Sequence, residues 1–110
     1  MRVELLYADG DPASMPARQN LVEVLTEDAF ETTIQMIAVA SVADAQLLEM
    51  RGSPTVRIDG VDIDPEWAGP IGLAARAYAA EDGTSGAVPG KPLIRRAVER
   101  ARGWGHGRPG

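Results

Sequence analysis

The chain has 110 residues, of which 45% are hydrophobic, and it contains no cysteine. This length suits one compact domain with its own core. The missing cysteine excludes disulfides, thiolate metal sites and thiol nucleophiles, so any redox activity would need a bound cofactor. The net charge of −5 is uneven, since residues 1–90 carry 5 basic and 15 acidic side chains and residues 91–110 carry 6 basic and 1 acidic. An acidic body argues against a nucleic-acid partner, whose phosphates require a basic face.

The sequence also argues against membrane association. No apolar stretch approaches the roughly 18 to 20 residues of a membrane-spanning helix, and the N-terminus lacks the pattern of a signal peptide. The basic end fits the last turns of a helix, where cations complement the helix dipole. We therefore expect a cytoplasmic protein that binds no membrane.

The first half of the chain predicts two strands that alternate with two helices. Residues 2–8 alternate in polarity before an Asp-Gly turn, which predicts a strand. Apolar positions at helical spacing predict a helix over 14–27. Residues 34–39 are apolar on both faces, as in a central strand that helices cover on each side. A start at Ser41 that resembles a capping box predicts a second helix over 42–51.

The second half of the chain is richer in turns. Residues 54–58 are β-branched and alternating, which predicts a third strand with a proline at its first position. Residues 60–71 are acidic and turn-rich. The alanine-rich segment 73–79 predicts a fourth strand, although its composition also allows a helix. A last helix is predicted over 89–102, and the Gly-rich residues 103–110 are predicted to be a disordered tail.

Together these elements predict one α/β domain over residues 1–102, in the order β-α-β-α-β-β-α, with a mixed four-stranded sheet and helices on both faces. This order, with X-Pro-X-X at the first helix start and Gly-Ser-Pro-Thr before the third strand, resembles the thioredoxin fold. More narrowly, four segments are similar to short bacterial thioredoxin-like proteins, which are often labelled thioredoxin family or alkylmercury lyase. These segments are Leu-Tyr-Ala-Asp-Gly-Asp-Pro (6–12), Arg-Gly-Ser-Pro-Thr-Val-Arg-Ile-Asp-Gly (51–60), Gly-Leu-Ala-Ala-Arg-Ala-Tyr (72–78) and Asp-Gly-Thr-Ser-Gly-Ala-Val-Pro (82–89).

The sulfur on which that family's chemistry depends is missing here. In the family the first segment usually reads Gly-Cys-Pro and the third reads Gly-Leu-X-Cys-Arg-X-Tyr. In this chain Asp11 stands at the first cysteine, Ser14 at the second of a Cys-X-X-Cys pair, and Ala75 at the cysteine of the fourth strand. Dithiol exchange and carbon–mercury cleavage both need thiolates, so the resemblance implies a thioredoxin-like protein without either activity.

Asp11 and Ser14 have a structural interpretation as well as a functional one, because both residue types cap helices well. A cap at Ser14 would place Pro16 in the first turn, where its missing N–H costs nothing. A cap at Asp11 would place Pro16 beyond the free donors, so Ser14 is the better cap candidate. Asp11 would then face solvent or a ligand, beside the loop that holds Pro54.

Pro54 precedes the third predicted strand. The resemblance implies a cis Ser53–Pro54 bond that leaves the backbone of Ser53 pointing outward, ready to pair with an extended peptide or glutathione. The alternative is that the proline only ends the loop and protects a strand edge.

The remaining polar groups predict no metal or catalytic site. His106 is the single histidine, so a histidine-based metal site or a catalytic triad would lack partners. Trp67 and Trp104 fit packing residues better than a binding platform. Four carboxylates lack the spacing of a calcium loop and fit a solvated acidic loop, namely Asp59, Asp62, Asp64 and Glu66.

We therefore predict a redox-inactive binding module for a peptide, a small thiol compound such as glutathione, or a protein partner, with no cofactor and an oligomeric state that stays open. The predicted ligand-binding residues are Asp11, Pro12, Ser14, Ser53, Pro54 and Thr55. One alternative is an enzyme in which Ser14 activates a glutathione-type thiol, since a hydroxyl beside free N–H donors can stabilise a thiolate. Another is a cysteine-free variant of a thiol-disulfide oxidoreductase or of a mercury-handling protein.

Overall fold

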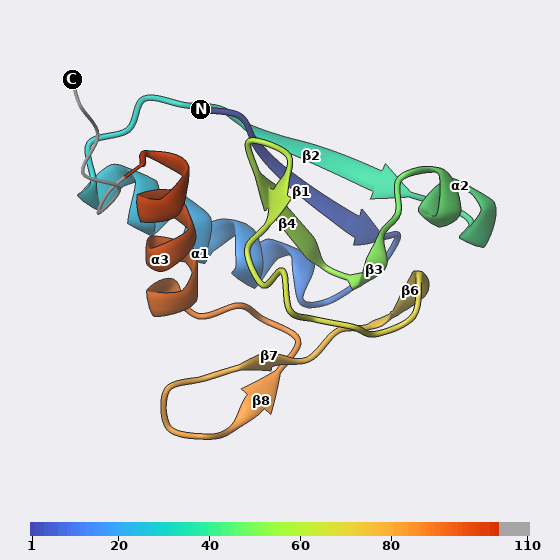
Figure 1. Cartoon of the computed structure of the whole chain (residues 1–110). Coiled ribbons are helices and arrows are strands. Elements are labelled where there is room, and N and C mark those ends of the chain that lie inside the picture. The colour runs from blue at the N-terminus through green and yellow to red at the C-terminus, as the bar shows by residue number, and fades with distance from the viewer. Residues whose placement is uncertain (104–110) are drawn as a thin grey trace.

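Over residues 1–103 the fold is a mixed α/β arrangement built on a four-stranded mixed sheet with three helices (Figure 1). The computed structural model describes residues 1–103, so the tail predicted from residue 103 onward, with Trp104 and His106, lies outside the described residues apart from Gly103. The sheet contains β1 (Val3–Ala8), β2 (Ile34–Val39), β4 (Thr55–Ile58) and β5 (Val61–Asp62), in the order β2-β1-β4-β5. The β1–β2 pair is parallel, whereas β1–β4 and β4–β5 are antiparallel.

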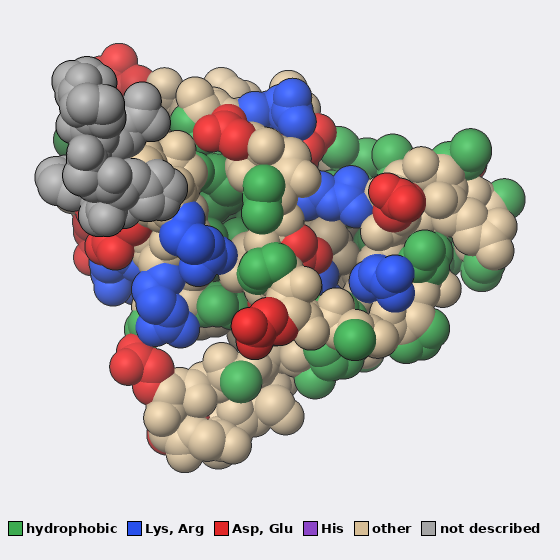
Figure 2. All heavy atoms as spheres, in the orientation of Figure 1, with side chains coloured by type: hydrophobic (Ala, Val, Ile, Leu, Met, Phe, Trp, Pro, Cys, Tyr) green, Lys and Arg blue, Asp and Glu red, His purple; other side chains and the backbone are tan. Residues whose placement is uncertain are grey.

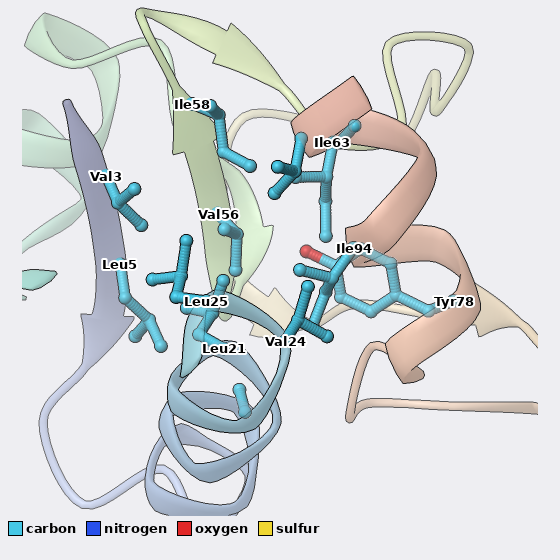
Figure 3. Packing of buried hydrophobic residues seen from close by; sticks show 13 residues of the cluster. Val3, Leu5, Leu21, Val24, Leu25, Val56, Ile58, Ile63, Tyr78 and Ile94 are labelled. Carbon is cyan, nitrogen blue, oxygen red and sulfur yellow. The ribbon is translucent and has the colours of Figure 1, made fainter. Parts of the chain in front are cut away.

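Helices cover both faces of this sheet. The helices α1 (Ser14–Glu27) and α3 (Lys91–Ala101) pack on one face, and the short α2 (Val42–Leu47) packs on the other. Because side chains alternate along a strand, Leu5 joins the cluster under α1 and α3 while Leu6 joins the cluster under α2. Figure 3 shows the larger cluster, in which strand residues meet Leu21, Val24 and Ile94 from the two helices. Its remaining labelled members are Val3, Leu25, Val56, Ile58, Ile63 and Tyr78.

The prediction that residues 34–39 form a central strand is wrong, because among the described strands β2 pairs with β1 alone and lies at the edge of the sheet. The pattern is still explained by contacts on both faces. Ile34 and Met36 pack against the larger cluster, and Ile37 packs against the smaller one. The apolar pattern of a strand indicates which of its two faces are covered by other side chains. It does not indicate whether another strand pairs with the backbone on each side.

The second helix is shorter than predicted. It begins as expected, with the Ser41 hydroxyl accepting a hydrogen bond from the Asp44 N–H at 3.1 Å. It ends at Leu47 instead of residue 51, because Glu49 adopts a left-handed φ of 53° and the chain then turns into β3 (Arg51–Ser53). The predicted strand over 54–58 is therefore β4 alone, and Pro54 separates it from β3.

The predicted fourth strand is split and lies outside the main sheet. Its first part is β6 (Gly72–Ala75), which runs parallel to β3, and its second part is β7 (Tyr78–Ala79), which pairs antiparallel with β8 (Ser85–Gly86). Besides β1, the antiparallel neighbour of β4 in the main sheet is instead β5, from the segment predicted as loop. The two-residue connection Asp59–Gly60 has φ values of 52° and 81°, the geometry that Asp-Gly favours in a tight hairpin.

Candidate functional site

The loop before α1 is held by the side chain and the backbone of Asp11. The Asp11 N–H donates to the Ala8 carbonyl at 3.0 Å, and its carboxylate accepts from the Ala13 N–H at 2.9 Å. The Ser14 hydroxyl donates to the Asp11 carbonyl at 2.8 Å. These bonds fold residues 8–14 into a compact turn that leads directly into the helix.

The prediction that Ser14 caps α1 is wrong. The N-cap position is Ala13, no side chain caps it, and Ser14 is the first helical residue. Its hydroxyl turns back to the preceding turn because the Asp11 carbonyl lies within hydrogen-bond distance. Pro16 is then the third helical residue, where its missing N–H still costs nothing.

Ser53 connects this turn to the loop before β4. Its hydroxyl donates to the Asp11 carboxylate and accepts from the Ala8 N–H at 2.9 Å. The side chain is buried, with the residue only 1% exposed. The sequence predicted that Asp11 would face solvent or a ligand. In the structure Asp11 is half-buried, and both of its carboxylate oxygens accept hydrogen bonds from within the chain.

The backbone of Ser53 is paired within the molecule. The Ser53–Pro54 bond is cis, as predicted. The expected outward-pointing carbonyl is not available, however, because the Ser53 carbonyl accepts from the Arg76 N–H at 3.0 Å and Ser53 is the register partner of Ala75 in the β3–β6 pair. The position beside Ser53 where an extended peptide was expected to pair is occupied by β6.

Pro54 and Thr55 are both buried and satisfied internally. The Pro54 carbonyl accepts from the Tyr78 hydroxyl at 2.6 Å. The Thr55 hydroxyl donates to the Gly52 carbonyl at 2.7 Å, and it accepts from the Arg76 guanidinium at 3.2 Å. Ser53, Pro54 and Thr55 therefore position the loop and leave little of their own surface for a ligand.

Arg76 is the organising residue that the sequence reasoning missed. Its side chain has no exposed surface, and its two terminal nitrogens each lie 2.7 Å from an oxygen of the Asp62 carboxylate. The guanidinium also lies 4.7 Å from the ring centre of Tyr78 and 5.6 Å from that of Trp67. A single cation in an alanine-rich segment, two residues before a tyrosine, was the available signal, because Arg and Tyr stack well.

Tyr78 is buried beside this ion pair. Burial raises the pKa of the Tyr78 phenol well above its ordinary value, and the positive charge of Arg76 opposes this only in part. The phenol therefore stays protonated and keeps donating to the Pro54 carbonyl across the physiological pH range.

Two carboxylates of the acidic segment, those of Asp59 and Asp62, accept hydrogen bonds from other parts of the chain. Asp62 pairs with Arg76, and the Asp59 carboxylate accepts from the Arg2 N–H at 2.6 Å. Within residues 1–103 no group of three or more His, Asp or Glu side chains is placed to hold a metal ion.

Two of the exposed apolar surfaces within residues 1–103 lie at the start of α1 and on α2, while Met1 and Val61 are exposed elsewhere. At the start of α1, Pro12 is exposed and Met15 is 60% exposed, within four residues of Asp11 in the chain. On α2, Val42 is 54% and Leu47 is 83% exposed. Figure 2 shows apolar side chains gathered at the end of the molecule that holds α2, whereas acidic and basic side chains are interspersed over the rest of that face.

Comparisons of the chain with protein-family models, with curated proteins and with solved structures find no match. In the described part of the chain, no helix is both long enough and apolar enough to cross a membrane. The site must therefore be interpreted from its own geometry.

Proposed function

We propose that the chain is a thioredoxin-fold binding module without redox chemistry of its own, which takes an extended peptide, a small thiol compound or a protein partner at the start of α1. One observation carries the proposal. The three positions where the resembled family has cysteines belong to one connected network, since Asp11 is hydrogen-bonded to Ser14 and Ser53, and Ser53 is the register partner of Ala75. A cytoplasmic location is part of the same proposal.

The ligand would contact the exposed part of this network. Pro12 and Met15 offer exposed apolar surface close to Asp11 in the chain, and the half-buried Asp11 carboxylate accepts from the Ser53 hydroxyl. An apolar ligand side chain that covers Met15 would be stabilised by roughly 25 cal/mol for each Å² removed from water. The buried residues behind the surface are held rigidly, so little ordering cost is added on binding.

The hydrogen bonding of Ser14 favours binding over the glutathione-dependent enzyme. A hydroxyl stabilises a thiolate by donating its proton, and the Ser14 hydroxyl already donates to the Asp11 carbonyl in a buried position. The alternative that the chain is a cysteine-free variant of a thiol-disulfide oxidoreductase is tested separately, with a variant that carries both Asp11→Cys and Ser14→Cys. Absence of disulfide reductase activity in that variant would argue against such an origin.

The proposal is tested by two matched substitutions on the two exposed apolar surfaces. Affinity for glutathione and for a panel of extended peptides is measured by calorimetry with wild type, Met15→Glu and Leu47→Glu. Both positions are exposed, so both variants are expected to fold. We expect Met15→Glu to weaken binding at least about tenfold and Leu47→Glu to leave it unchanged. Loss of binding only in Leu47→Glu would place the site on α2 and contradict the proposal.

A further inference from the structure

The two edges of the main sheet differ in how they are protected against pairing with another chain. At one edge, β5 has only two residues and ends in the charged Asp62. Very short strands and charged side chains are the usual protection of a sheet edge. At the other edge, β2 has six residues, Ile-Gln-Met-Ile-Ala-Val, with no charge and no proline. Figure 1 shows β2 as the outermost strand, and no strand within residues 1–103 pairs with its outer side.

The side chains of β2 also leave apolar surface at this edge. Ile34 and Met36 pack on the larger core cluster from one face, and Ile37 packs on the smaller cluster from the other. All three remain only partly buried, because the sheet stops at this strand. An outer neighbour would cover these side chains on both faces and would pair the open backbone groups, which is the environment that the sequence pattern of this strand fits.

We propose that the outer edge of β2 binds a second copy of this chain, antiparallel about a two-fold axis, so that the two four-stranded sheets join into one. The neutrality of the strand fits this occupant, because it removes the repulsion that usually opposes self-pairing. Two-fold symmetry places a strand opposite itself, which normally brings like charges together. Here a register centred on Met36 places Gln35 opposite Ile37, and Ile34 opposite Ala38, so no charged pair arises. A register centred on Ile37 is equally free of charge.

The expected association is modest in strength. Six residues per strand give a small interface, at the lower end of the sizes seen for specific complexes. We therefore expect micromolar rather than nanomolar affinity. The dimer leaves the start of α1 uninvolved, so this inference is independent of the proposed function.

The test uses the two exposed side chains of the strand, Gln35 and Ala38. The mass of the full chain in solution is measured by sedimentation at about 100 µM, where a micromolar dimer is populated. We expect twice the mass of one chain for wild type. The double variant Gln35→Lys with Ala38→Lys should raise the dissociation constant at least about tenfold, because like charges then lie diagonally opposite in either register. Val61→Lys, at the opposite edge of the sheet, should change nothing.

A charge-reversed partner separates lost pairing from lost folding. An equimolar mixture of the double Lys variant with the variant Gln35→Glu and Ala38→Glu should regain twice the mass of one chain, because opposite charges then meet across the edge. A wild-type mass of one chain would overturn the proposal. So would a dimer that the Lys substitutions leave intact or one that Val61→Lys abolishes.

Discussion

The substitution Asp62→Asn tests whether the buried Arg76 holds the loops behind the site together. The carboxylate binds two guanidinium nitrogens at 2.7 Å each, and the Arg76 side chain is fully buried while Asp62 keeps 24% of its surface. Removing one partner of a buried pair leaves an uncompensated charge and costs about 3 to 5 kcal/mol. Because Asp62 is partly exposed to solvent, which screens the pair, we expect a cost below that range, about 2 to 3 kcal/mol. For a domain of this size that corresponds to a fall in Tm of roughly 10 to 20 °C.

The assay is urea and thermal unfolding, with Asp64→Asn as the matched control. Asp64 contacts Arg76 only through its backbone carbonyl, at 3.2 Å, so removing its side-chain charge should cost less than about 0.5 kcal/mol. If Asp62→Asn were as stable as Asp64→Asn, Arg76 would not depend on its carboxylate, and the account of the buried pair would be refuted.

Other predictions concern Tyr78 and the glycines. Tyr78→Phe removes the donor to the buried Pro54 carbonyl and should lower the free energy of unfolding by about 1 to 3 kcal/mol in urea. Because burial raises the Tyr78 pKa, wild-type stability should be complete below pH 10 and fall as pH rises above it, and unfolding of Tyr78→Phe between pH 9 and 11 should show less of this loss. Gly52→Ala places a Cβ 3.1 Å from the Ala74 carbonyl at a φ of 94°, whereas Gly83→Ala at a φ of 87° meets nothing. Thermal unfolding should show a larger loss for Gly52→Ala, and equal losses would mean that strain alone matters.

The sequence predicted the elements whose signals are local. The bounds of α1 match the prediction of residues 14–27, because its apolar positions recur at helical spacing. The Asp59–Gly60 hairpin also carries a local signal, because Asp-Gly favours a two-residue turn, although the turn-rich composition of residues 60–71 predicted no strand after it. The edge position of β2 had no local signal. It results from the pairing of β1, which has β2 on one side and β4 on the other.

The sequence predicted that Asp11, Ser14 and Ser53 lie close together, and it did not predict their hydrogen bonding. The resemblance brought Asp11, Ser14 and Ser53 together, and the structure connects them. Nothing in the local sequence indicated that β6 would pair with β3 and occupy the Ser53 carbonyl, because the two segments are about 20 residues apart and Arg76 beside them pairs with the distant Asp62. Long-range contacts of this kind are decided by tertiary packing, which outweighs local propensity.

The most direct test of the proposed binding site is backbone amide NMR of the full chain during titration with glutathione and with extended peptides. The account predicts chemical-shift changes confined to residues 10–16 and to Ala75 and its neighbours on β6, at the start of α1 and the strand beside Ser53. Changes confined to α2, or no change at millimolar ligand, would contradict a binding site at the start of α1.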